Sequence, residues 1–192
     1  MSLSELEIST AWIDSCARGD RDALRALYEA YKDRVYSIAF HFYSGDSTAA
    51  VEATQQVFLK LMTSIAKFRG ESDFATWLYR LVVNVCLDDV RRNRARKETP
   101  RDQLPELGQP QSQEEDLARD QVAHAVRTAV SSLPPKLRLA ILLRYFDELS
   151  YGQMAGMLSC SAGTVASRLS RGHRLLAEKL ERFRGWEVTG KR

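Results

Sequence analysis

The residues best suited to chemistry are the basic side chains near the end of the chain. Residues 161–184 contain six Lys or Arg and two Glu, a net charge of +4. Apolar residues recur at helical spacing, at Val165, Leu169, Leu176 and Leu180, which predicts a helix with the bases on its outer face. An arginine presents a planar fork of N–H donors that can grip guanine N7 and O6 or a phosphate.

The residues of this helix that lie off its apolar side are the candidates for contact with DNA: Ser161, Thr164, Ser167, Arg168, Arg171 and Arg174. Arg168 and Arg171 could equally hold phosphates, which position a protein without reading sequence. An ordinary antiparallel helix pair with a solvated basic face would also explain these residues.

The preceding segment determines how this helix is presented. "LSYGQM" (149–154) predicts a helix start with a capping box, in which Ser150 is the N-cap and Gln153 is at N3. A break at "SCS" (159–161) follows, and Ser161 can cap the last helix. Two helices joined by such a tight turn form a helix-turn-helix, whose second helix enters the major groove.

A second basic cluster ends the segment 72–97, which is predicted to be one helix from about Phe74 to Lys97. Its apolar stripe consists of Trp77, Leu78, Leu81, Val82 and Val85, and a different face carries Arg80, Asn84, Asp88 and Arg91. Five bases follow within residues 91–97. A buried helix with a solvated basic tail would suit the helix dipole, but five bases exceed what a helix end requires.

Three aromatic residues lie at the start of this helix. Aromatic rings beside a basic surface can hold single-stranded nucleic acid by stacking and charge. We expect Phe74 and Tyr79 to face a ligand, whereas a lone Trp77 is more often a core residue.

The helix predicted over 48–68 carries a third signal. Its polar face consists of Glu52, Gln55, Gln56, Lys60 and Thr63, and Leu59 lies in the middle of that face. An exposed Leu ringed by polar groups indicates a protein-contact patch, although an incidental exposed Leu explains it equally well.

The whole chain is predicted to be all-α, because no segment of its 192 residues shows sustained alternation with period two. Residues 100–116 contain three of the five prolines, and residues 102–120 contain six acids and one base. This composition predicts a flexible acidic linker between two separately folding helical modules. A solvated loop inside one domain is the alternative.

Other features exclude several protein classes. Cys16, Cys86 and Cys160 are widely spaced and contain no CxxC pair, which argues against a disulfide framework or zinc site and fits a reducing cytoplasm. The N-terminus lacks a signal-peptide pattern, and no apolar run approaches the roughly 20 residues of a membrane helix. Scattered histidines and the absence of catalytic motifs predict no enzyme, no metal and no cofactor.

Two stretches resemble a known family. Residues 50–96, including "FATWLYRLVVNVCLDDVRRNRAR", are similar to conserved region two of bacterial extracytoplasmic-function (ECF) sigma factors of the sigma-70 family. Residues 133–176, including "LSYGQMAGMLSCSAGTVASRLSRG", resemble region four. The resemblance implies a region-two domain over 1–99, a linker over 100–116 and a helix-turn-helix domain over 117–192.

The resemblance also implies roles and partners. Contact with core RNA polymerase would involve Glu52, Gln55, Gln56, Leu59 and Lys60. Recognition and melting of the −10 element would involve Arg69, Phe74, Trp77, Tyr79, Arg80, Asn84, Asp88, Arg91 and Arg92. The last helix would read the −35 element, and an anti-sigma factor would hold the protein inactive.

The chain departs from the family pattern in the polymerase contact, at Val51-Glu52, and on the reading helix, at Ala166 and residues 171–173. Val51-Glu52 replaces a usual pair of acids, Ala166 stands where Lys is frequent, and "RGH" (171–173) replaces Arg-Ala-Arg. The promoter sequence is therefore not predicted. The main alternative is a stand-alone helix-turn-helix regulator in which residues 1–97 sense a signal or dimerise. A helical adaptor with two solvated basic surfaces is the third possibility.

Overall fold

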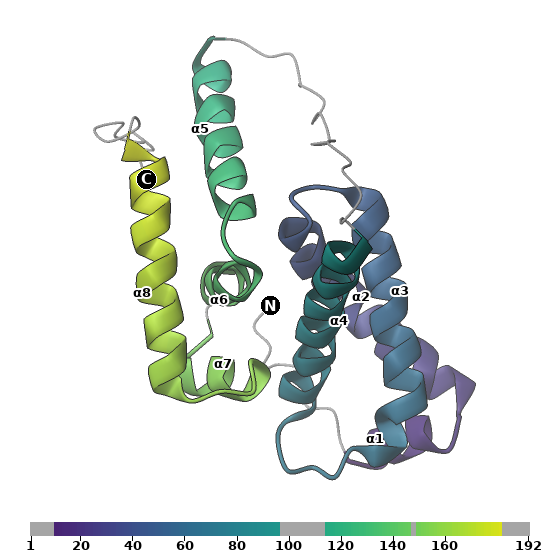
Figure 1. Ribbon diagram of the computed structural model, residues 1–192. Helices are drawn as coiled ribbons and strands as arrows, with labels where there is room; N and C mark the ends of the chain where they lie inside the picture. The colour runs from purple at the N-terminus through teal and green to yellow at the C-terminus, as the bar shows by residue number, and fades with distance from the viewer. Residues whose placement is uncertain (1–9, 97–113, 147–148, 182–192) are drawn as a thin grey trace.

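The computed structural model describes residues 10–96, 114–146 and 149–181, and these residues form helices and turns without strands. The predicted all-α class is confirmed. The helices are α1 (Thr10–Ala17), α2 (Arg21–Phe42), α3 (Ser47–Ser64), the short 3-10 helix η2 (Ile65–Lys67), α4 (Phe74–Arg96), α5 (Glu114–Ser131), α6 (Pro135–Phe146), α7 (Tyr151–Met157) and α8 (Ala162–Lys179). Figure 1 shows α1–α4 on one side of the molecule and α5–α8 on the other.

Aspartate side chains fix the starts of two helices in the first group. Asp20 Oδ1 accepts from the backbone N–H groups of Asp22 and Ala23, at 2.9 and 3.1 Å. Asp46 Oδ1 accepts from the N–H of Ala49 at 3.0 Å, so Asp46 is the N-cap of α3. Each carboxylate satisfies an N–H that has no partner within its helix.

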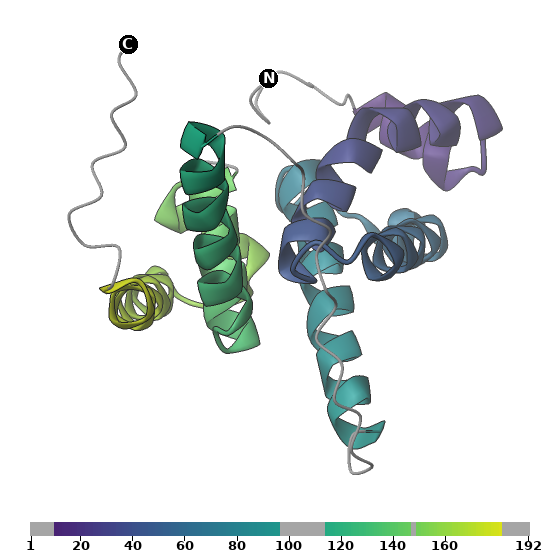
Figure 2. The ribbon, with the colours of Figure 1, turned by 90° about the horizontal axis from the view of Figure 1, so that it is seen from above.

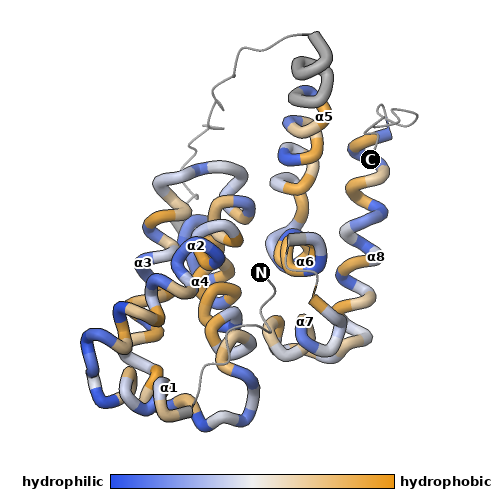
Figure 3. Tube along the Cα trace, turned by 180° about the vertical axis from the view of Figure 1, so that it is seen from behind, coloured by the Kyte–Doolittle hydropathy of each residue, from blue (hydrophilic) through white to orange (hydrophobic). Residues whose placement is uncertain are grey.

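The core of the first group lies between α2, α3 and α4. Phe42, Leu61 and Leu78 are fully or almost fully buried there. Figure 3 shows hydrophilic and hydrophobic residues alternating along these helices, as expected when one face of each is packed. The C-terminal half of α4 projects beyond the helices that pack against its first half (Figure 2).

In the second group, α7 and α8 form the predicted helix-turn-helix. The backbone N–H of Ser150 donates to Gln153 Oε1 at 2.9 Å, and the N–H of Gln153 donates to Ser150 Oγ at 3.3 Å, which confirms the capping box. α6 supports α8 where a glycine permits close approach: a Cβ on Gly172 would lie 3.0 Å from Ile141 Cγ1.

The two groups of helices are in direct contact. One continuous hydrophobic cluster includes Leu78 and Val82 of α4 together with Leu139 and Met154 from the second group. The predicted linker 100–116 lies outside the described residues except for its last three positions, which begin α5. The predicted independence of the two modules therefore stays a prediction.

Candidate nucleic-acid interface

The N-terminal end of α8 is organised by the hydroxyl groups of Ser161 and Thr164. Ser161 Oγ accepts from the backbone N–H of Thr164 at 3.2 Å and lies 3.0 Å from Thr164 Oγ1. Ser161 is exposed and Thr164 is half-buried. The cap fixes where α8 begins and leaves its first turn open to solvent, as contact with a groove requires.

The remaining predicted residues of α8 lie on its outer side. Ser167, Arg171 and Arg174 are exposed, whereas Arg168 is half-buried. Arg174 Nε lies 4.0 Å from Glu178 Oε1, a weak pair between exposed side chains. The structure therefore places all six predicted residues on one helix or its cap.

One polar pair on α8 was missed by the sequence analysis. His173 Nε2 lies 2.9 Å from the hydroxyl of Tyr145, a residue of α6 whose exposed fraction is 62%. The two rings meet edge to face, with their centroids 5.7 Å apart. No local signal joins these residues, because they are distant in sequence and meet only through the packing of α6 on α8.

The predicted −10 face of α4 is only partly open. Asn84 and the loop residue Arg69 are exposed. Arg80 is half-buried, and its Nε donates to the backbone carbonyl of Gly156 in α7 at 2.6 Å. The guanidinium that was predicted to meet DNA thus has a protein partner from the second group of helices.

The basic end of α4 is balanced by acids one turn earlier. Asp88 Oδ1 lies 3.0 Å from Arg91 Nη1, and Asp88 Oδ2 lies 3.5 Å from Lys60 Nζ of α3. Arg92 Nη2 lies 3.5 Å from an oxygen of Asp89. These exposed ion pairs lower the positive electrostatic potential of the α4 surface, but they restrain the paired side chains only weakly.

The expected role of two aromatic residues is wrong. Phe74 and Tyr79 are only 5% and 2% exposed, so both rings belong to the core and neither faces a ligand. The centroids of the Phe74 and Phe68 rings lie 5.7 Å apart. Phe68 belongs to the segment before α4 and adds an apolar contact at the start of this helix. Trp77 is half-buried against Phe68 at 5.6 Å, so it combines core packing with partial exposure.

The exposed face of α3 is more apolar than the sequence analysis recognised. Val51, Leu59 and Met62 are 45%, 56% and 56% exposed. Together with Gln55 they follow the spacing i, i+4, i+8 and i+11, which places them on one stripe. The predicted residues Glu52, Gln55, Gln56 and Lys60 are also exposed. Such a stripe, bordered by polar groups, is typical of a protein-docking surface.

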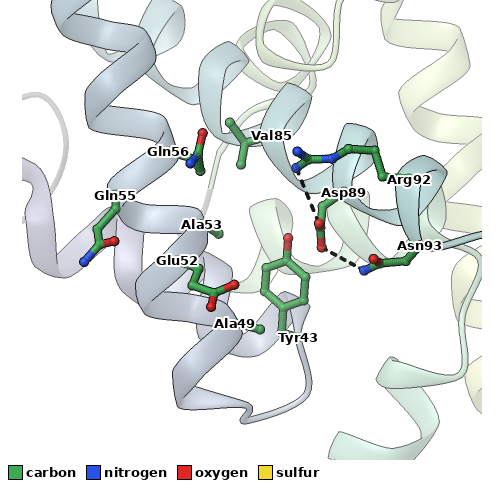
Figure 4. Close-up of a pocket in the computed structure, with 10 residues that line it drawn as sticks. All are labelled: Tyr43, Ala49, Glu52, Ala53, Gln55, Gln56, Val85, Asp89, Arg92 and Asn93. Atoms are coloured by element: carbon green, nitrogen blue, oxygen red, sulfur yellow. Dashed lines mark hydrogen bonds and ion pairs between the residues drawn. The ribbon is translucent and has the colours of Figure 1, made fainter. Parts of the chain in front are cut away.

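A cavity of about 270 Å³ lies between this surface and the end of α4 (Figure 4). Its polar lining includes Glu52 and Gln56 from α3, Asp89 and Arg92 from α4, and the hydroxyl end of Tyr43. Burial, with the nearby Cys86 and Asp89, raises the pKa of Tyr43. Burial likewise raises the pKa of the Cys86 thiol to about 12, so the thiol stays protonated and poorly reactive.

Two other features are absent from the parts of the chain that the structure describes. No group of three or more His, Cys, Asp or Glu side chains there could hold a metal ion. None of the described helices is both long enough and apolar enough to cross a membrane.

Two sequence families match this chain. Residues 27–96 match Sigma-70 region 2, and residues 123–176 match Sigma-70, region 4. The RNA polymerase sigma-H factor of Pseudomonas aeruginosa is 30% identical over 179 residues, which cover 88% of this chain and 92% of that protein. The ECF RNA polymerase sigma-E factor of Escherichia coli K12 is 29% identical over 192 residues, with coverages of 93% and 97%.

Solved structures share the fold. CnrH, in complex with the cytosolic domain of CnrY, matches with a TM-score of 0.64 at 20% identity, covering 90% of this chain and 96% of CnrH. The sigma factor RpoE, in complex with the anti-sigma factor NepR from Bartonella quintana, has a TM-score of 0.64 at 21% identity, with coverages of 82% and 96%. With both sequence regions present in order and a relative matched over nearly its whole length, the chain belongs to the ECF group of the sigma-70 family of RNA polymerase sigma factors.

Proposed function

We propose that this sigma factor docks core RNA polymerase through α3 and directs transcription initiation by contacting promoter DNA with α4 and α8. The observation that carries the proposal is the exposed apolar stripe of α3, which contains Leu59 and Met62, beside the basic end of α4. A stand-alone regulator could use an exposed apolar stripe to dimerise, but it has no use for a second nucleic-acid surface directly beside that stripe. The stripe and the basic end of α4 together therefore favour a polymerase subunit over the regulator.

Each surface then has a distinct task. α8 enters the major groove of the −35 element, where Arg171 and Ser167 reach base edges and Arg168 and Arg174 hold phosphates. Arg69, Asn84 and Arg91 follow the −10 strand, with the exposed part of Trp77 beside them. Residues 1–99 and 117–192 form the two working domains. The chemistry of RNA synthesis belongs to the polymerase, and this subunit supplies recognition.

We also propose that an anti-sigma factor controls the protein in the cytoplasm. Two proteins that share its fold, CnrH and RpoE, were solved with CnrY and with the anti-sigma factor NepR, respectively. A partner that covers the α3 stripe would bury the apolar surface that polymerase requires, so the two partners would compete.

The decisive experiment is transcription in vitro with purified protein, bacterial core polymerase and a library of promoter fragments. Discrete start sites that appear only when the protein is added are expected, and they would define the promoter sequence at once. A folded protein that gives no transcript, yet binds an operator tightly as a dimer without polymerase, would instead establish the stand-alone regulator.

A further inference from the structure

We infer that the cleft between α3 and α4 binds a free guanine nucleotide, with the base at one end and the phosphates at the other. Two adjoining cavities, of about 270 and 370 Å³, make up this cleft and share Gln56, Val85 and Arg92 in their linings. Their sizes are close to or within the roughly 300–1,000 Å³ of small-molecule sites. Nucleotide binding itself does not depend on the proposed function, but its consequence for polymerase docking does.

The base end of the cleft is the smaller cavity, around Glu52 and Tyr43. Figure 4 shows both side chains directed into this space. Ala49, Ala53 and Val85 line the same cavity, and their small apolar side chains leave room for a flat ring between the two helices. An apolar lining with polar groups at its edge is typical of a site for a planar aromatic ligand.

The carboxylate of Glu52 determines which base fits. It is exposed and has no hydrogen-bond or ion-pair partner among the described residues. Asp89, the other carboxylate of this cavity, is instead held by Arg92 and Asn93 at 3.5 and 3.2 Å. An ionised carboxylate accepts two parallel hydrogen bonds and donates none. Guanine offers two neighbouring donors on one edge, N1–H and the N2 amino group, whereas adenine offers a donor beside an acceptor. The free carboxylate therefore favours guanine.

The phosphate end of the cleft is the adjoining cavity. Three cations line it, Lys60 of α3 with Arg91 and Arg92 of α4, and Asp88 is the acid in the same lining. Asp88 pairs with Lys60 at 3.5 Å and with Arg91 at 3.0 Å, but these pairs join exposed side chains and contribute little to stability. A phosphate group carries more charge and more acceptor oxygens than one carboxylate, so it can displace Asp88 from both cations.

The two ends are separated by the length of a nucleotide. Glu52, Gln56 and Lys60 follow the spacing i, i+4 and i+8, so they form one ridge of α3 along the cleft. Glu52 and Lys60 lie about 12 Å apart along the helix axis, at ~1.5 Å per residue. The order of charges along this ridge matches one molecule with a hydrogen-bond-donating base edge and an anionic tail. A free base or a free phosphate would use only one end.

A nucleotide bound in the cleft would compete with core polymerase. Glu52, Gln55 and Gln56 line the base end and are also among the residues proposed to dock polymerase. Polymerase on α3 would therefore cover the cleft before the promoter is engaged, which excludes promoter DNA as the source of the base. The ligand is a free nucleotide, and its binding would couple promoter recognition to the nucleotide supply of the cell.

Calorimetric titration of the full chain tests the site without polymerase. GDP should bind at least about tenfold more tightly than ADP, guanosine or inorganic pyrophosphate, because only GDP uses both ends. Equal affinity for GDP and pyrophosphate would reduce the cleft to a nonspecific anion site, and undetectable GDP binding would overturn the inference. If a single-stranded dT20 probe containing one dG binds through Glu52 while GDP does not, the base comes from DNA and the free-nucleotide inference is wrong.

Single substitutions at exposed positions test the two ends separately. Glu52→Gln should remove the preference for GDP over ADP, because an amide no longer offers two acceptors. Lys60→Gln should weaken GDP binding and leave guanosine binding unchanged. Glu71→Gln, at an exposed loop position outside both linings, is the control and should bind GDP like the wild type. A Glu52→Gln variant that still prefers GDP would show that the base does not lie against Glu52.

Ala49→Met tests the consequence for polymerase. Ala49 lines the base end and lies outside the residues proposed to dock polymerase, so a longer side chain there fills the space of the base without changing the charge. GDP should weaken the binding of fluorescently labelled wild type to core polymerase several-fold and leave Ala49→Met unaffected. GDP is used because polymerase consumes GTP. An equal effect on both proteins would place the action of GDP on polymerase and refute the competition. If the wild type does not bind polymerase at all, the proposed function fails, and calorimetry still decides the nucleotide site.

Discussion

Lys60 Nζ of α3 lies 3.5 Å from Asp88 Oδ2 of α4, so the helix proposed to dock polymerase and the helix proposed to follow DNA share an ion pair. Asp88 also pairs with Arg91 at 3.0 Å. The Asp88 carboxylate therefore partly neutralises Lys60 on the surface of α3 and Arg91 on the surface of α4. Because the pairs are exposed, their effect on stability is small, at most about 1 kcal/mol. Their main effect is on the electrostatic field that DNA meets.

Replacing this carboxylate should strengthen DNA binding. Asp88→Asn removes the partner of Arg91 and Lys60, so affinity for dT20 at low salt should rise several-fold, and the salt dependence should steepen by about one unit of slope. Fluorescence anisotropy across a salt series measures both quantities. Asp33→Asn, an equal change of charge at an exposed position of α2, is the control. An equal gain in both variants would reduce the role of Asp88 to net charge alone.

The α3 stripe should be required for polymerase binding. Leu59→Asp puts a charge in the middle of an apolar interface, where it would be desolvated without a partner, and binding to core polymerase should become undetectable. Since Leu59 is 56% exposed, the melting temperature should hardly change. Size-exclusion chromatography with core polymerase and thermal unfolding measure the two effects. Ala26→Asp, at an exposed site of α2, should bind normally, and normal binding of Leu59→Asp would contradict the assigned docking face.

Local signals in the sequence predicted the helices that became α3 and α4 and the capped helix-turn-helix of α7 and α8. The capping box of Ser150 and Gln153 depends only on residues within one turn, and so does the cap at Asp46. Burial of Phe74 was not predicted, because Phe68 reaches it from outside the helix. The contact of Arg80 with Gly156 could not be predicted from the sequence either, since the two residues are 76 positions apart and meet only when the two groups of helices pack together.

Arg171 should contribute sequence specificity at the −35 element. If its guanidinium makes a bidentate contact with a base, Arg171→Ala should cost about 1–3 kcal/mol on the cognate promoter and much less on a scrambled −35 element. Competition binding of the polymerase holoenzyme measures the difference. Arg174→Ala is the comparison, because Arg174 is proposed to hold a phosphate and should weaken both DNAs alike. Equal losses on both DNAs for Arg171→Ala would make it a phosphate contact as well.

The packing of α8 against α6 should depend on Gly172. A Cβ at this position would lie 3.0 Å from Ile141 Cγ1 and 3.1 Å from Ile141 Cδ1, and Ile141 is only 5% exposed, so it has little room to move. Gly172→Ala should therefore lower the free energy of unfolding by about 1–3 kcal/mol, despite the better helix propensity of Ala. Urea denaturation followed by circular dichroism measures the change.

The same helix offers the matched control for that substitution. Gly163→Ala adds a Cβ whose nearest atom is Ser161 Oγ at 3.9 Å, so helix propensity alone should act and stability should rise by up to about 1 kcal/mol. Opposite signs for the two Gly→Ala changes would show that close packing of α6, rather than any general need for glycine, sets the position of the reading helix. If Gly172→Ala instead raises the free energy of unfolding, the Ile141 side chain can shift to make room for the added methyl group. In that case this contact does not fix the position of α8.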